Sequence, residues 1–124
     1  MNRGALMESA KLMEKVVRTL DAKKAQYITC LDISELTTMA DYFVICTGTS
    51  STHVKALSDE LDEKLSEEGI KFLGKEGFRN ANWILMDYDS VIVHIFSSET
   101  RDFYSIENLW ADAKKVDIES YIVK

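Results

Sequence analysis

The segment "DYFVICTG" constrains the fold most strongly, because it is apolar without interruption from Tyr42 to Cys46. A strand with one solvated face alternates apolar and polar residues, whereas a strand covered on both faces forms a continuous apolar run. The sequence therefore predicts a β-sheet that has a layer of structure on each side.

Two amphipathic helices are predicted around this strand. Between Ala5 and Leu20 the apolar residues recur at helical spacing, with charged residues between them. The segment "HVKALSDELDEKLSEEG" has the same pattern. Ser50 or Ser51 is placed to cap its N-terminus, and Gly69 is placed to end it.

Three further strands and a third helix complete the predicted elements. "AQYITCLDIS" is rich in strand-forming residues, and "WILMDY" with "SVIVHIF" predicts a hairpin that turns around Asp89 and Ser90. "IKFLGKEGFRNAN" is interpreted as a loop, and "SETRDFYSIENLWADAKK" has the spacing of a helix. The last residues, "VDIESYIVK", leave three interpretations open: an extra strand, a tail or an oligomer contact.

This order of elements predicts the fold class. Helix, strand, strand, helix, strand pair and helix is typical of an α/β or α+β domain in three layers, with a small mixed β-sheet flanked by helices. A chain of 124 residues is of ordinary size for one domain, and it contains no proline. We therefore expect a single domain over residues 1–124.

Composition excludes some classes of protein. No apolar run approaches the roughly 20 residues that span a bilayer, and the first residues do not resemble a signal peptide, so a cytoplasmic protein is expected. A net charge of -6 disfavours non-specific nucleic-acid binding and suits a basic protein partner better. Cys30 and Cys46 lie within apolar segments and are interpreted as buried free thiols in a reducing compartment.

The segment "CTGTSST" runs from a predicted strand through Gly48 into a predicted helix. Such a junction exposes backbone N–H groups that can hold a phosphate. However, the segment lacks the Lys and the second Gly of a Walker A loop, and it is not a dinucleotide-binding fingerprint. A tight turn with a helix cap is the favoured interpretation.

Asp87 and Asp89 form an Asp-x-Asp pair of the kind that can hold a divalent cation for phosphoryl or nucleotidyl transfer. No third acid lies close enough in sequence to complete such a site, although Glu76 could approach it in space. The pair falls where the hairpin must turn, however, so a turn is favoured over a metal site. His94, between Val93 and Ile95, is interpreted as a residue of the sheet face.

Large aromatic residues are concentrated in the C-terminal half: Trp83, Tyr88, Phe96, Phe103, Tyr104 and Trp110. A domain of this size cannot bury all of them. Trp, Tyr and Arg often dominate binding energy at protein interfaces, and Tyr104 with Arg101 is expected at the edge of the last helix. The pattern predicts a protein-binding surface, and it leaves Trp83 and Trp110 open between core and interface.

Three segments in this order and spacing, "DYFVICTGTSSTHVKAL", "WILMDYDSVIVHIF" and "RDFYSIENLWADA", closely resemble the ribosomal silencing factor family, also called RsfS or Iojap-related proteins. The resemblance covers the chain from the first helix to Ala113. It implies a fold related to nucleotidyl transferases without their catalytic residues. It also implies a non-enzymatic role with no cofactor and no metal.

The resemblance further implies a partner. Members of the family bind the large ribosomal subunit through ribosomal protein L-fourteen, at the surface that would contact the small subunit. They thereby block subunit joining and repress translation, notably when nutrients are scarce, and organellar relatives act in assembly of the large subunit. A homodimer, an assembly role, and a residual nucleotide-binding or nucleotidyl-transfer enzyme are the alternatives left open.

Carried over onto matching positions, the family's partner-binding surface falls on Trp83, Tyr88 and Tyr104. Glu76, Asp87 and Arg101 lie in the same matched segments and are weaker candidates. The chain departs from the family pattern at Asp89, where relatives carry a turn glycine. If the turn keeps its shape, Asp89 must adopt a positive φ, which Asp tolerates at modest cost.

Overall fold

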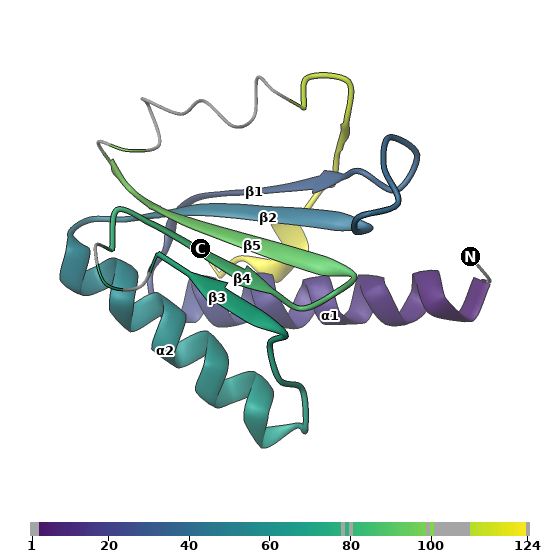
Figure 1. Cartoon of the computed structure of the whole chain (residues 1–124). Coiled ribbons are helices and arrows are strands. Elements are labelled where there is room, and N and C mark those ends of the chain that lie inside the picture. Colours follow the sequence, from purple (N-terminus) through teal and green to yellow (C-terminus); the bar gives the residue numbers. More distant parts are fainter. Residues whose placement is uncertain (1–2, 78, 80, 99, 101–109, 124) are drawn as a thin grey trace.

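The computed structural model describes residues 3–77, 79, 81–98, 100 and 110–123, with side chains described from residue 8 onward. In this part of the chain one mixed sheet of six strands has both α-helices on the same face (Figure 1). The elements are α1 (Arg3–Ala22), β1 (Gln26–Asp32), β2 (Tyr42–Gly48), α2 (Ser51–Glu67), β3 (Gly74–Glu76), β4 (Trp83–Asp87), β5 (Val91–Ser97), β6 (Lys114–Lys115) and the 3-10 helix η1 (Glu119–Tyr121).

The strand order is β3-β4-β5-β2-β1-β6. β2 and β5 form a parallel pair at the centre, and every other neighbouring pair is antiparallel. The predicted mixed α/β sheet and the predicted hairpin of β4 and β5 are therefore confirmed. β3 was not predicted, because three residues are too few to show an alternating pattern within a segment interpreted as a loop.

Two apolar cores lie on the two faces of the sheet. The core on the helix side contains residues of α1, α2 and the sheet, among them Val16, Val17, Leu20, Leu57, Leu61, Val44, Cys46, Ile84, Met86 and Ile95. The core on the opposite face contains Leu31, Ile33, Ala40, Phe43, Ile45, Ile92 and Phe96, with Trp83, Leu85, Trp110 and Ala113 packed against it. The continuous apolar sequence of β2 thus reflects burial on both faces, as expected.

Local signals set the ends of α2. The Ser50 hydroxyl accepts a hydrogen bond from the His53 backbone N–H, as the predicted N-cap requires. Gly69 has a φ of +79° just beyond the helix, and the Ile70 N–H donates to the Leu65 carbonyl. This left-handed turn ends the helix where glycine was expected to end it.

The last described residues pack against the body of the domain. β6 pairs with β1, η1 packs against α1, and Ile118 is buried. The Val123 N–H donates to the Asp21 carboxylate, and the Arg18 guanidinium lies over the Tyr121 ring. Residues 116–123 of "VDIESYIVK" thus form a tail that folds back onto α1 and not an extra strand, while the oligomer contact stays a prediction.

The helix predicted over 98–115 falls largely outside the described residues. Its predicted end at Lys115 is wrong, because Lys114 and Lys115 form β6 against β1. Cross-strand hydrogen bonds determine the local structure there, and helical spacing does not reveal them.

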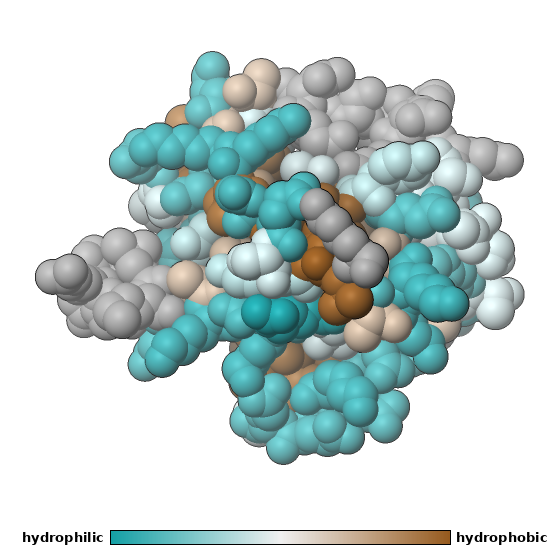
Figure 2. Space-filling model, turned by 180° about the vertical axis from the view of Figure 1, so that it is seen from behind, coloured by the Kyte–Doolittle hydropathy of each residue, from teal (hydrophilic) through white to brown (hydrophobic). Residues whose placement is uncertain are grey.

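The surface offers little contiguous apolar area on the face opposite to the view of Figure 1. Figure 2 shows this face mostly hydrophilic, with hydrophobic residues confined to small areas between polar side chains. No helix among the described residues has the combination of length and hydropathy needed to cross a membrane.

Candidate functional site

Strand β4 distributes its side chains to the two faces of the sheet. Ile84 and Met86 belong to the helix-side core, whereas Trp83 and Leu85 pack against the opposite core. Successive residues of a strand point to opposite faces. Asp87 therefore shares the face of Trp83 and Leu85, away from α1 and α2.

Glu76 of β3 joins the same face. In the antiparallel pair of β3 and β4, Glu76 lies directly opposite Leu85, and Gly74 lies directly opposite Asp87. Directly opposed residues project to one side of a sheet. Trp83, Leu85, Asp87 and Glu76 thus form one surface, which we call the β3–β4 surface; Glu76 is exposed and the other three are half-buried.

Tyr88 is not part of this surface. Its side chain is 4% exposed and belongs to the helix-side core, with its ring 6.4 Å from that of Phe72 in an edge-on contact. Burial, and to a lesser extent the charge of Asp62, raises the pKa of Tyr88. The expectation that Tyr88 faces a partner beside Trp83 is therefore wrong, because strand alternation continues one residue beyond β4 and turns the side chain inward.

Two of the predicted partner-binding residues, Tyr104 and Arg101, lie outside the described residues. Their place at the surface stays a prediction from the sequence.

Trp83 is held by two neighbours on β5. Its ring stacks on that of Phe96, with centroids 5.0 Å apart and an interplanar angle of 26°. Its indole Nε1–H donates a hydrogen bond of 3.1 Å to Nδ1 of His94. Trp83 is half-buried, so the question left open by the sequence has a mixed answer: one side of the ring packs on the sheet and the remainder reaches the surface.

His94 is a buried residue of the sheet face, as interpreted from the sequence. Its side chain is 4% exposed, and burial lowers its pKa to about 4. The neutral ring makes a T-shaped contact with that of Phe43, with centroids 4.8 Å apart. Sequence reasoning missed its hydrogen bond with Trp83, because only the register of β4 against β5 makes the two residues neighbours.

The Asp-x-Asp pair is a turn. Asp87 Oδ1 accepts a 2.7 Å hydrogen bond from the Asp89 backbone N–H, and Asp89 has a φ of 72°. The favoured turn interpretation and the expected positive φ are both confirmed. Within the described ranges, no three His, Cys, Asp or Glu side chains are grouped so that they could hold a metal ion.

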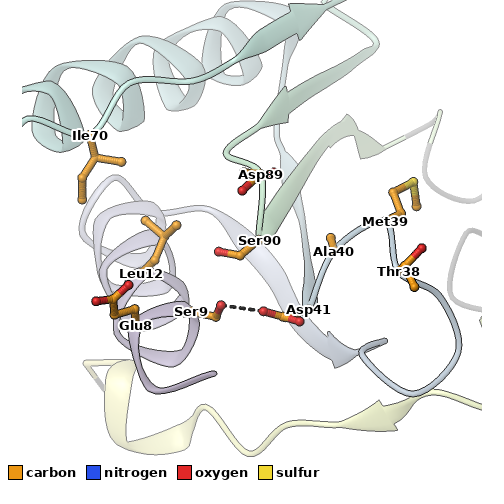
Figure 3. Close-up of a pocket in the computed structure, with 10 residues that line it drawn as sticks. All are labelled: Glu8, Ser9, Leu12, Thr38, Met39, Ala40, Asp41, Ile70, Asp89 and Ser90. Carbon is orange, nitrogen blue, oxygen red and sulfur yellow. Dashed lines mark hydrogen bonds between the residues drawn. The ribbon is translucent and has the colours of Figure 1, made fainter. Parts of the chain in front are cut away.

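Asp89 instead lines a hollow of about 500 Å³ between α1, the loop before β2 and the β4–β5 turn. Figure 3 shows Ser9 and Asp41 facing each other within it, joined by a hydrogen bond of 2.6 Å from the Ser9 hydroxyl to Asp41 Oδ2. Asp41 is almost fully buried, and its other carboxylate oxygen has no hydrogen-bond partner among the described residues. The hollow shares no residue with the β3–β4 surface, although Asp89 is hydrogen-bonded to Asp87.

The "CTGTSST" junction uses its polar groups internally. The Thr49 N–H donates to Nδ1 of His53, and Nε2 of His53 lies 3.0 Å from the Lys23 carbonyl oxygen. A Cβ on Gly48 would lie 2.7 Å from Cγ2 of Val54, so glycine is needed for close packing of the turn on α2. The predicted strand-to-helix turn is confirmed.

Comparison with known proteins places this arrangement in a family. The family model described as "Ribosomal silencing factor during starvation", RsfS, matches residues 6–124. The ribosomal silencing factor of Halalkalibacterium halodurans is 36% identical over 94% of this chain and 99% of its own length. That of Bacillus subtilis is 35% identical over 91% of this chain and 96% of its own length.

Solved structures agree with the sequence comparison. A crystal structure from Chromobacterium violaceum aligns with a TM-score of 0.80 and 34% identity over 82% of this chain and 85% of that one. Another from Bacillus halodurans aligns with a TM-score of 0.78 and 33% identity, over 87% of this chain and 98% of that one. Because the family model matches nearly the whole chain and two relatives at least 35% identical are covered over more than nine-tenths of their length, the chain belongs to the ribosomal silencing factor family.

Proposed function

We propose that this protein binds the large ribosomal subunit and represses translation by occupying the surface that the small subunit needs. The relatives are named ribosomal silencing factors, which is the main support for a ribosome-associated role. The proposed mechanism is steric. It requires affinity and position, and it requires no bond-breaking step.

The observation that carries the proposal is the composition of the β3–β4 surface. Trp83 offers a large ring held in place by its neighbours, and Glu76 and Asp87 place two carboxylates on the same face. Lys75, which precedes Glu76 in sequence, is directed to the helix side, where its Nζ lies 3.8 Å from Asp59 Oδ1. The surface thus combines an aromatic anchor with negative charge, which suits a basic and partly apolar patch on a ribosomal protein.

We further propose ribosomal protein L-fourteen as the contact on the large subunit, as the family resemblance implies. Purified L-fourteen and isolated large subunits are the two reagents that test this. Equal affinity for both supports L-fourteen as the whole contact. Binding to the subunit without binding to the isolated protein counts against it.

The function is tested by sedimentation. The protein is mixed with purified large and small subunits under conditions in which they associate, and its position in the gradient is followed. We expect it to travel with the large subunit and to reduce the fraction of joined ribosomes. Joining that proceeds unchanged at saturating protein would contradict steric repression.

A role in assembly of the large subunit is a second candidate. A mouse relative is named "Mitochondrial assembly of ribosomal large subunit protein 1" and is 29% identical over 79% of this chain, which spans 44% of its length. Depletion of this protein distinguishes the two roles. Accumulation of immature large subunits during growth favours assembly, whereas loss of repression with normal subunits favours silencing.

The residual nucleotide-binding or nucleotidyl-transfer enzyme is tested by calorimetric titration with ATP and Mg²⁺. The His53 N–H already donates to the Ser50 hydroxyl and the Val54 N–H to the Ser50 carbonyl, which leaves fewer N–H groups for a phosphate at this end of α2. We expect no heat of binding and no shift in melting temperature.

A further inference from the structure

The contact between Trp83 and His94 follows from the register of two strands. Trp83 lies directly opposite Phe96, and Leu85 lies directly opposite His94. His94 is therefore the diagonal neighbour of Trp83 on the same face, a position that only long or aromatic side chains reach. The indole Nε1 spans this diagonal and comes within 3.1 Å of His94 Nδ1.

The chemistry of the two rings assigns the direction of this hydrogen bond. An indole N–H is a donor only, so Nδ1 of His94 must accept and the ring proton must reside on Nε2. The imidazole cannot easily turn away. It is nearly fully buried, with the Phe43 ring in a T-shaped contact and the Phe96 ring almost parallel to it at 6.2 Å.

We propose that His94 is a positioning residue for Trp83: by accepting the indole N–H, it directs the hydrocarbon part of the ring toward the partner. This inference rests on the proposed function and specifies the partner's chemistry. The partner needs no acceptor for the indole, because that donor is already used. It needs an apolar side chain against the ring, with Lys or Arg nearby to meet Glu76 and Asp87.

The hydrogen bond matters because the indole is only half-buried. The χ2 torsion of Trp is broad, so the hydrogen bond to His94 restricts a ring orientation that the torsion by itself does not fix. A buried N–H without an acceptor is also costly, which favours rotation of the ring toward water when the acceptor is lost. Replacement of His94 should therefore alter the outward face of Trp83 without moving β4.

Two substitutions distinguish loss of the hydrogen-bond acceptor from a change in side-chain volume at position 94. His94→Asn keeps an oxygen close to the position of Nδ1, whereas His94→Phe keeps an aromatic ring and removes the acceptor. The readout is hydrogen exchange of the Trp83 Nε1–H by NMR, with its resonance distinguished from that of Trp110 by Trp83→Phe. We expect slow exchange in the native protein and in His94→Asn, and fast exchange in His94→Phe. Slow exchange in His94→Phe would overturn the proposal.

Binding to purified large subunits provides the second readout, as a double-mutant cycle. His94→Phe should weaken binding about fivefold, the typical effect of one hydrogen bond, and His94→Asn should restore most of it. In a Trp83→Phe background, which has no indole N–H, His94→Phe should have no further effect. An equal loss in both backgrounds means that His94 does not act through Trp83.

The outcomes distinguish this proposal from the proposed function. Native-like binding by Trp83→Ala removes the β3–β4 surface from the function, while hydrogen exchange still reports whether His94 holds the ring. Should His94→Phe fail to fold, the native protein decides the matter by itself. A Trp83 Nε1–H that exchanges as fast as in the urea-unfolded chain overturns the positioning role, and one that is protected by tenfold or more supports it.

Discussion

Trp83 begins β4, Tyr88 follows its last residue, and the two side chains face opposite sides of the sheet. Trp83 packs against the core on the face opposite to the helices and reaches the surface, whereas Tyr88 is buried in the helix-side core beside Phe72. Two aromatic residues that are close in sequence therefore have different roles. One is suited to binding a partner, and the other stabilises the fold.

Trp83→Ala should weaken binding to the large subunit by about 2 kcal/mol or more, because a large aromatic anchor is lost from the β3–β4 surface. The measurement is a binding titration, with circular dichroism to verify the fold. Tyr27→Ala is the matched control, since Tyr27 is 75% exposed on β1, and two strands separate β1 from β4 in the sheet. Equal affinities for the two variants would remove Trp83 from the interface.

Tyr88→Ala should lower the free energy of unfolding by about 3 to 4 kcal/mol, because it leaves a cavity in the helix-side core. Tyr88→Phe keeps the ring and removes a buried hydroxyl that has no hydrogen-bond partner among the described residues, so stability should be unchanged or slightly higher. Urea denaturation measures both. Loss of subunit binding by a stable Tyr88→Phe would show that the hydroxyl contacts the partner after all.

Glu76→Lys should weaken binding several-fold, chiefly through slower association, because it reverses an exposed charge on the β3–β4 surface. The effect should shrink as salt is raised, since exposed charges are screened. Glu63→Lys is the control, because Glu63 is exposed on α2 at the opposite face. The same loss in both variants would indicate a general effect of net charge.

Stability should fall as the pH is lowered from 7 to 5, by about 2 kcal/mol from His94 alone. The pKa of His94 is lowered from 6.5 to about 4 by burial, so the unfolded chain takes up the proton first as the pH falls. The loss starts near pH 6.5 and is complete near pH 4. Urea denaturation across this range should show a shallower slope for His94→Asn, and an identical slope would contradict the assignment.

Asp89→Gly should raise the free energy of unfolding by about 0.5 to 1 kcal/mol, because glycine adopts the φ of 72° without the cost that a Cβ imposes. Thermal denaturation measures the change. Asp89→Val is the comparison variant and should lower the free energy of unfolding, since a β-branched side chain disfavours this conformation. A loss of stability in Asp89→Gly would mean that a contact of the Asp89 side chain stabilises the fold by more than the positive φ costs.

Local patterns predicted much of this fold because they depend on neighbours in sequence. The stripe of α1, the Ser50 cap of α2 and the continuous apolar run of β2 each predicted the observed element. The short strands β3 and β6 escaped prediction. Each exists only through hydrogen bonds to a strand elsewhere in the chain, and two or three residues carry no periodicity of their own.

The candidate surface was predicted in part. Matched residues indicated Trp83, Glu76 and Asp87, and the structure brings these three to one face. They also indicated Tyr88, which the structure buries. Sequence matching compares positions and does not report the direction of a side chain, so a residue matched for one role can face the core.

The sequence by itself determined the helices, the central strands, the turn at Asp89 and the resemblance to ribosomal silencing factors. Each of these rests on residues adjacent along the chain or on the order of long segments. The tertiary structure alone decided that Trp83 meets His94 while Tyr88 turns inward. The physical reason is register: the pairing of β4 with β5 and β3 sets which side chains become neighbours, and hydrogen bonds between distant backbone groups fix that pairing.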